Sequence, residues 1–205
     1  MKKKYLELTK RIQAIAQIGL AYATNDYDLE RYRELREISV ELMHEFSGAD
    51  ISKIKTLFAS QSGYPTPMVD IRAVIFKDNK ILLVKEKKEG CWALPGGWAD
   101  IGYTPSEVAI KEVKEEAGLD VQASRILAIL DKKCHNHPPQ PFYTYKIFIQ
   151  CDITGGKLNP GHETSDVQFF SLDNLPELSK DRNTKSQIKM VFKQMHDPTA
   201  AVEFD

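Results

Sequence analysis

Hydrophobic residues near the start of the chain recur at the spacing of an α-helix. Steps of four and three residues connect Leu8, Ile12, Ile15, Gly19 and Tyr22, which places them on one helix face. A second run with similar steps covers residues 29–46 and ends at Gly48, a typical helix stop. Asp50 is suited to cap a short third helix. The pattern predicts an all-helical N-terminal domain over residues 1–62.

The pattern changes after a segment rich in proline and serine. Pro65 and Pro67 follow Gly63, which predicts a linker at residues 63–68. Beyond it, alternating residues predict a strand at 69–76, and Asp78-Asn79 predicts a hairpin turn. Further strands are predicted at 81–84, 91–94, 126–130, 143–151 and 167–170, with a last helix around 184–195. Strands and helices intermix without regular βαβ alternation, so residues 69–205 are predicted to form an α+β sandwich with a mixed sheet.

Between the third and fourth of these strands lies a helix with clear boundaries. Thr104 is a good N-cap, Pro105 falls at the first helical position and Glu107 at the third, which predicts a capping box. Gly118 marks the end of this helix.

Three glutamates share one face of that helix. Glu112, Glu115 and Glu116 lie three and four residues apart. Two unit charges about 4 Å apart repel by roughly 4 kcal/mol at an effective dielectric near 20, and a divalent cation reverses that penalty. A run of charges is usually only a solvated helix face. However, Gly96 and Gly97 leave backbone free to approach a ligand closely, so loop and helix together predict a site for a metal and a phosphate.

This segment closely resembles the Nudix box, in which a glycine, five residues, an acidic position, seven residues, a basic residue and Glu-x-x-Glu-Glu-x-Gly follow one another. Gly97, the three glutamates, Gly118 and the apolar Val113 and Leu119 match it. Tyr103 and Lys111 depart, because they stand where the family has a bracing Glu and Arg. Since both partners of that ion pair are replaced together, we expect a loop braced in another way rather than an inactive site. The resemblance covers roughly residues 68–196 and implies a Nudix-type α/β/α sandwich.

The resemblance implies Mg²⁺-dependent hydrolysis of a nucleoside diphosphate linked to another moiety, with release of a nucleoside monophosphate. It implies that the three glutamates, with the Gly96 carbonyl, hold Mg²⁺, for which Mn²⁺ can substitute. Glu115 and the loop residue Glu163 are the expected catalytic groups, Glu163 as general base or further metal ligand. Overall layout and the Trp98-Ala99-Asp100 continuation are most similar to CDP-choline pyrophosphatases, with ADP-ribose pyrophosphatases as the next likeness.

Substrate contacts are expected at four further positions. Gly97 allows close approach of the backbone, and Trp98 either stacks on a nucleobase or packs under the loop. Arg72 contacts a phosphate or pairs with Asp70, and the ion pair is favoured because both residues lie on the same strand face. Arg182 reaches the substrate or the helix that follows it. The cluster from Cys134 to Pro139 is interpreted as a loop lining the substrate rather than a metal site.

Composition excludes several other classes of protein. The formal net charge of -1 disfavours bulk nucleic-acid binding, and 42% hydrophobic residues suffice for a real core. The 3 cysteines have no Cys-x-x-Cys spacing, so neither a disulfide framework nor a thiolate zinc site is expected. No apolar stretch of the sequence is long enough to span a bilayer, and a cytoplasmic protein is expected.

The N-terminal helices have apolar stripes that need a partner. They pack either on the catalytic domain or on a second copy, and a homodimer is the favoured hypothesis. Two functions compete with the leading one. The first is hydrolysis of nucleoside triphosphates or RNA ends, and the second is a nucleotide-sensing module without catalysis. Base and leaving group are not encoded in any spacing.

Overall fold

The computed structural model describes residues 2–197 and 199–205. The chain divides into two compact units. Residues 1–67 and 139–143 form the first, and residues 68–138 and 144–205 form the second. The short segment at 139–143 therefore belongs with the helices, although in sequence it lies between two strands of the second unit.

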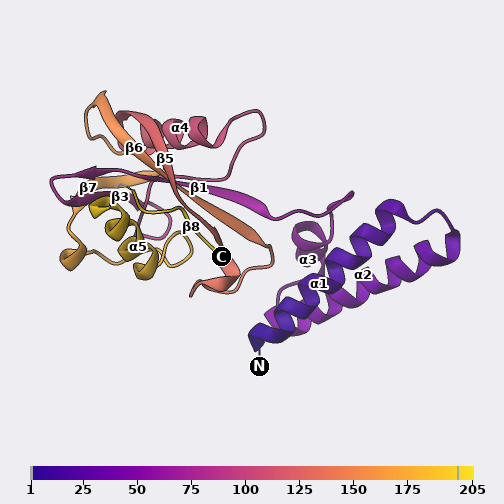
Figure 1. Ribbon diagram of the computed structural model, residues 1–205. Coiled ribbons are helices and arrows are strands. Elements are labelled where there is room, and N and C mark those ends of the chain that lie inside the picture. Colours follow the sequence, from indigo (N-terminus) through magenta and orange to yellow (C-terminus); the bar gives the residue numbers. More distant parts are fainter. Residues whose placement is uncertain (1, 198) are drawn as a thin grey trace. The chain divides into compact units, whose positions relative to one another are not determined.

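Three helices make up most of the first unit (Figure 1): α1 (Lys2–Tyr22), α2 (Asp26–Ser47) and α3 (Ile51–Phe58). The caps confirm the predicted helix stop at Gly48 and the predicted cap at Asp50. The Asn25 side chain accepts a hydrogen bond from the Asp28 N–H, Gly48 ends α2 in the left-handed conformation, and the Asp50 side chain accepts from the Ser52 N–H. Each cap satisfies a backbone group that the helix end leaves open.

The contact between α1 and α2 is unusually polar. Gln13 and Ser39 are both buried, and the Ser39 hydroxyl donates to the Gln13 side chain at 3.0 Å. Gly19 permits close approach, because a Cβ there would lie 2.3 Å from the Tyr32 ring. A buried apolar cluster of the unit involves α2 and α3 instead, and its members are Val40, Met43, Ile54, Phe58 and Ala59.

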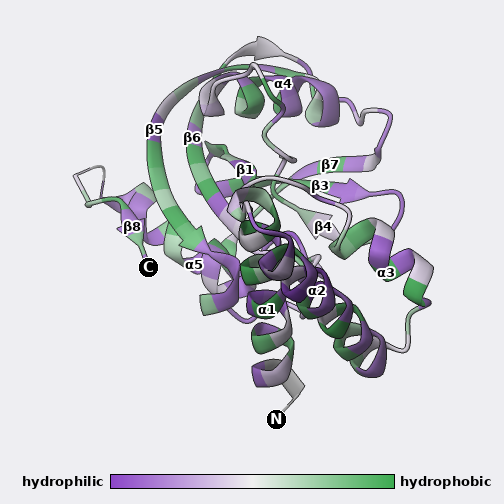
Figure 2. Cartoon of the chain, turned by 90° about the vertical axis from the view of Figure 1, so that its right-hand side faces the viewer, coloured by the Kyte–Doolittle hydropathy of each residue, from purple (hydrophilic) through white to green (hydrophobic). Residues whose placement is uncertain are grey.

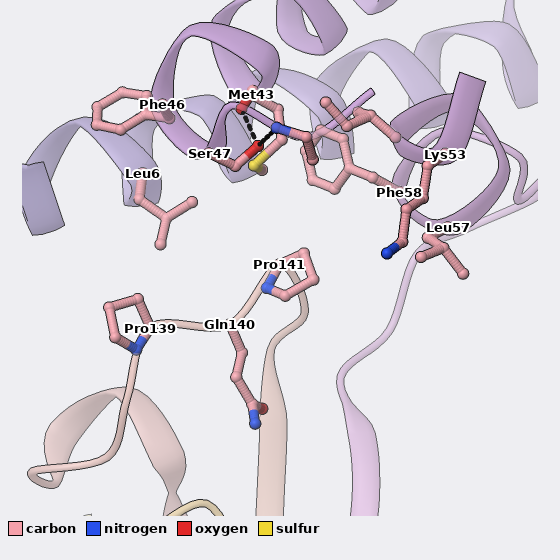
Figure 3. Close-up of a pocket in the computed structure, with 12 residues that line it drawn as sticks. Leu6, Met43, Phe46, Ser47, Lys53, Leu57, Phe58, Pro139, Gln140 and Pro141 are labelled. Carbon is pink, nitrogen blue, oxygen red and sulfur yellow. Dashed lines mark hydrogen bonds between the residues drawn. The ribbon is translucent and has the colours of Figure 1, made fainter. Parts of the chain in front are cut away.

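Segment 139–143 adds to the same unit. Pro139 and Pro141 face the helices across an apolar groove of about 350 Å³, whose opposite wall includes Leu6, Phe46 and Phe58 (Figure 3). The Gln140 side chain points away from the groove in this view. The Nζ atom of Lys10 lies 3.9 Å from the centroid of the Tyr143 ring.

The second unit contains two four-stranded sheets. The first has the order β1 (Met68–Val74), β6 (Thr144–Gly156), β5 (Leu119–Asp131), β8 (Glu203–Phe204). β1 runs parallel to β6, β5 runs antiparallel to β6, and β8 runs parallel to β5, so the predicted mixed sheet is confirmed. The second sheet is antiparallel and comprises β2 (Phe76–Lys77), β3 (Lys80–Glu86), β4 (Trp92–Ala93) and β7 (Thr164–Phe170).

Two helices lie on opposite sides of these strands: α4 (Pro105–Ala117) and α5 (Lys185–His196) (Figures 1 and 2). Val108, Ala109 and Val113 of α4 join one buried cluster with strand residues from both sheets. Ile188, Val191 and Phe192 of α5 join the other. The predicted layered α+β architecture is therefore confirmed. Two short 3₁₀ helices, η1 (Lys132–Cys134) and η2 (Leu172–Asn174), complete the unit.

The sequence pattern located most elements but missed β8 and both 3₁₀ helices. Asp78 and Asn79 both have positive φ, 52° and 57°, as the tight hairpin turn between β2 and β3 requires. β5 and β6 are longer than the predicted strands at 126–130 and 143–151. The hydrophobic pattern did not reveal the remaining residues, because long stretches of each strand are polar and only partly buried. β8 was not predicted, since two exposed residues carry no periodic signal. Within the described residues, no helix is long and apolar enough to cross a membrane.

Candidate active site

Helix α4 begins and ends as the sequence predicted. Thr104 and Glu107 form the reciprocal capping box, Pro105 stands in the first turn, and Gly118 ends the helix with φ 74°. These boundaries fix the rotation of α4, which keeps Val113 in the core and leaves Glu112 and Glu115 less buried. The helix is therefore a rigid support for its carboxylates.

The glycine loop is attached to β1 and to α4 at once. The Ile71 N–H donates to the Gly97 carbonyl, and the Gly96 N–H donates to Glu116 Oε2 at 2.9 Å. Gly96 has φ 144°, and a Cβ there would lie 2.0 Å from the Ile71 carbonyl oxygen. Only glycine permits this approach, which brings the backbone of the loop beside the Glu116 side chain.

Glu112 and Glu116 of α4 stand in an environment that opposes the ionisation of their side chains. Burial raises the pKa of Glu116 to about 8, against the opposing effects of the Gly96 N–H and of Arg72. Burial, together with the charges of Glu115 and Glu163, also raises the pKa of Glu112, and Arg72 and Lys111 act in the opposite direction. Such a site is short of positive charge, and a divalent cation would supply it.

The donor set fits a hard cation. A Cβ on Gly97 would lie 2.6 Å from Glu112 Oε1, so the glycine leaves space that this carboxylate uses. All the side-chain donors are oxygens, which Mg²⁺ and Mn²⁺ prefer. Among the residues that the structure describes, no three acidic, histidine or cysteine side chains converge on one point. The carboxylates therefore line a shared face of α4 rather than enclosing an ion by themselves.

Glu163 lies on the loop that enters β7. It is exposed, and its charge contributes to the raised pKa of Glu112. The loop is held against the end of α4, because Thr164 Oγ1 donates to the Glu116 carbonyl and accepts from the Gly161 N–H. Glu163 therefore lies within electrostatic range of Glu112, and its catalytic role stays a prediction.

The replaced bracing pair has a substitute. Lys111 Nζ contacts Asp100 Oδ2 at 2.9 Å and lies 5.5 Å from the centroid of the Tyr103 ring. Asp100 follows the glycine loop, so this pair connects the loop to α4 from a different position. Lys111 keeps the positive charge that the family has at this position, and its acidic partner here is Asp100. This ion pair agrees with the expectation of a loop braced in another way.

The expected substrate contacts fall into two groups. Trp98 is 46% exposed, and its stacking on a nucleobase stays a prediction. Arg72 is 1% exposed and pairs with Asp70 at 2.8 Å while donating to the Leu94 carbonyl, which bears out the ion-pair alternative. Arg182 pairs with Glu86 at 3.2 Å and keeps about a third of its side chain exposed.

Sequence reasoning missed three buried charges near these residues: Asp70 as a shared anion, Glu86 and Lys146. Asp70 pairs with both Arg72 and Lys146, and these two cations hold its pKa below the usual value although burial acts in the opposite direction. A signal was present. Side chains two residues apart in a strand point to the same side of the sheet. Glu86 therefore points to the same side as Leu82 and Val84 on β3, and Lys146 to the same side as Phe148 on β6, so each is a charged residue at an inward-facing position.

Comparison with known proteins agrees with this geometry. The NUDIX domain pattern matches residues 66–192, and the pattern of a UDP-X-like, N-terminal oligomerisation domain matches residues 3–58. A capped helix that carries glutamates and packs against a glycine loop is typical of one class of hydrolases. The chain belongs to this class: it is a member of the Nudix family and a Nudix hydrolase.

Three relatives resemble the chain over much of its length. The putative ADP-ribose pyrophosphatase YjhB of Bacillus subtilis (strain 168) is 48% identical over 98% of this chain and 97% of its own. A solved UDP-X diphosphatase is 33% identical with a TM-score of 0.65 and covers 100% of this chain and 99% of its own. A solved ADP-ribose pyrophosphatase from Streptococcus suis 89-1591 is 45% identical with a TM-score of 0.63 over 68% of this chain and 100% of its own.

Proposed function

We propose that this Nudix hydrolase cleaves the phosphoanhydride bond of a nucleoside diphosphate linked to another moiety, and releases a nucleoside monophosphate. The observation that carries the proposal is the pair of buried or half-buried carboxylates, Glu116 and Glu112, held beside the Gly96–Gly97 backbone. The names of the relatives, ADP-ribose pyrophosphatase and UDP-X diphosphatase, support a substrate of this class.

Glu112, Glu115 and Glu116, with the Gly96 carbonyl, are the proposed ligands of Mg²⁺. The oxygen-only donor set supports Mg²⁺, with Mn²⁺ as a substitute. When bound, a divalent cation neutralises the diphosphate and favours the ionised form of a nearby water.

The proposed reaction is a displacement at phosphorus. A water oxygen forms a bond to one phosphorus, and the bridging P–O bond breaks with its electron pair remaining on the oxygen of the departing phosphate. The proton of the water passes to a carboxylate. Glu163 is the proposed acceptor, because it is exposed and lies within electrostatic range of Glu112. Glu115, which is also exposed, is the second catalytic candidate.

The role of Glu163 is testable by removing its charge alone. Glu163→Gln should lower kcat by about 100-fold or more at saturating Mg²⁺ if the carboxylate accepts the proton. Glu177→Gln, an acidic residue outside the site, serves as the control and should retain wild-type turnover. Wild-type kcat for Glu163→Gln would show that another group accepts the proton.

The substrate class is testable with a single panel. CDP-choline, ADP-ribose, a UDP-sugar, nucleoside triphosphates and short RNA are incubated separately with the enzyme and Mg²⁺, and released nucleoside monophosphate is measured. Turnover of the diphosphate conjugates above the others supports the proposal. Preferential turnover of triphosphates or RNA ends would replace it, and no turnover of any compound would favour a sensing module.

We also propose that the first unit associates with a second copy of the chain as a homodimer. Leu8, Ile15 and Tyr22 recur every seven residues on α1 and are 41%, 52% and 67% exposed, whereas the polar Gln13 is buried against α2. Ile38 and Leu42 of α2 are exposed as well. This arrangement, the apolar groove of Figure 3 and the match to an oligomerisation domain support self-association.

A further inference from the structure

The second unit buries a group of polar side chains that the proposed hydrolysis does not use. We call it the interior polar cluster, and it consists of Asp70, Lys132, His137, Thr144 and Lys146, all of them less than 9% exposed. Lys146 interacts electrostatically with Asp70 and Lys132, and the charges of both lysines lower the pKa of His137. Burying this many polar groups is costly unless each finds a partner.

The cluster begins where the catalytic carboxylates end. Arg72 interacts electrostatically with Glu116 on one side and forms the ion pair with Asp70 on the other. Asp70 in turn pairs with Lys146, its register partner across β1 and β6. A continuous row of charges therefore leads from the carboxylates of α4 into the cluster.

The members of the cluster lie at different depths. Lys146 is 0% exposed and bonded to Asp70, so it positions its neighbours instead of meeting a ligand itself. Lys132 and His137 come from the segment after β5 and are each 8% exposed. Lys132 Nζ is 3.8 Å from Asp181 Oδ1, which is longer than a hydrogen bond and leaves the ammonium group able to donate elsewhere.

His137 is held as a hydrogen-bond acceptor. Its Nδ1 lies 2.6 Å from the Lys180 carbonyl oxygen, and since a carbonyl can only accept, Nδ1 carries the hydrogen. Burial, the main cause, lowers the pKa of the ring to about 4, and the neighbouring lysines act in the same direction. The ring is therefore neutral at pH 7, with a lone pair on Nε2. That atom is buried and has no hydrogen-bond partner within the described chain, and neither has the buried Thr144 Oγ1.

We propose that Lys132, His137 and Thr144 recognise the nucleobase of the substrate, an inference that rests on the proposed function. A cationic donor beside a neutral acceptor matches the edge of a base, where carbonyl or ring nitrogen acceptors alternate with N–H donors. A phosphate has only acceptor oxygens and would face the lone pair of His137. An apolar leaving group would leave all three side chains unsatisfied.

The test uses equilibrium binding without metal, so that it does not depend on turnover. Binding of UMP, CMP, AMP and ribose 5-phosphate is measured by calorimetry in EDTA. Ribose 5-phosphate lacks the base. At least one nucleotide should bind the wild-type protein more tightly than ribose 5-phosphate does. The affinity for that nucleotide should fall by about tenfold in each of three variants, His137→Phe, Thr144→Val and Lys132→Met. The affinity for ribose 5-phosphate should be unchanged in all of them.

Matched controls separate recognition from folding. Lys133→Met makes the same change one residue further along, at an exposed position, and should leave all affinities unchanged. Thr144→Val is nearly isosteric and removes a hydroxyl whose oxygen has no partner, so its fold should be retained even if His137→Phe is unstable. Equal losses for nucleotide and ribose 5-phosphate, or no preference for the nucleotide in the wild type, would overturn the proposal. A failed hydrolysis panel would overturn the reaction and leave this measurement intact.

Discussion

At the scale of single residues, the site is organised around carboxylates that the fold keeps partly out of water. Glu116 is 8% exposed and held by the Gly96 N–H, and its raised pKa results mainly from burial. In the absence of a cation this residue costs stability, because the folded state must either bury a charge or retain a proton. Cation binding and proton release should therefore be coupled at this residue.

Glu116→Gln should separate activity from stability. The folded pKa of about 8 exceeds the ordinary 4.5, so between these values the unfolded chain has lost a proton that the folded chain keeps. The stability of the wild type therefore falls as pH rises through this window, and glutamine, which does not titrate, escapes the loss. In EDTA, the Tm of the variant minus that of the wild type should increase by a few degrees from pH 5 to pH 8.

The same variant should lose turnover by more than the roughly 10- to 100-fold that loss of an outer-shell partner costs a metal site. Calorimetric titration with Mn²⁺ should show weakened binding. A variant with full activity would contradict the metal assignment, and a Tm difference independent of pH would contradict the buried, protonated Glu116.

At the scale of elements, separate segments position the carboxylates by close backbone contacts. The glycine loop approaches β1 at Gly96, and the loop before β7 approaches the end of α4 at Gly161. A Cβ on Gly161 would lie 1.7 Å from the Glu115 carbonyl oxygen. Because these contacts are between backbones, no side-chain rotation relieves them, and each glycine fixes the distance between two elements.

Gly161→Ala should move the loop away from α4 and carry Glu163 with it. We expect a loss of about 1–3 kcal/mol in the free energy of unfolding, together with a decrease in kcat. Gly155→Ala is the matched control, since a Cβ there would lie 3.4 Å from Asp120 Oδ2 and 3.8 Å from Asp120 Cβ, and the effect should stay within about 0.5 kcal/mol. Urea denaturation and steady-state kinetics measure the two effects. Equal stability of both variants would show that the loop does not pack on α4 in this way.

At the scale of the whole molecule, the first unit buries polar side chains between its helices and exposes apolar ones, and a second copy of the chain would cover the exposed apolar surface. Its two long helices bury the Gln13–Ser39 hydrogen bond between them, while large apolar side chains of α1 remain exposed. An interface that covers Leu8, Ile15 and Tyr22 would remove this apolar surface from water and stabilise the pair.

Ile15→Glu should therefore shift the protein from dimer to monomer. The introduced carboxylate would lie in the centre of the exposed stripe and, by symmetry, near its own copy across a two-fold axis. Ala21→Glu introduces the same charge at an exposed position of α1 away from the stripe, and it should leave the mass unchanged. Light scattering at micromolar concentration gives the mass, and a monomeric wild type would refute the homodimer.

The sequence by itself determined the parts that depend on local chemistry. The helix boundaries followed from helical spacing, the Thr104 capping box and the glycines in the left-handed conformation. The spacing of Glu112, Glu115 and Glu116 placed them on one helix face, because the geometry of a helix fixes which residues are neighbours. The mixed arrangement of strands and helices was enough to give the layered α+β class.

Only the tertiary structure decided which distant residues meet. The replacement of the bracing pair by Asp100 and Lys111, and the row of charges from Arg72 through Asp70 to Lys146, join residues up to 76 positions apart. Such contacts depend on strand register and on the packing of loops against helices, which no local spacing encodes. An inward-facing charge on a strand can be recognised in the sequence, but its partner is defined only once the sheets have formed.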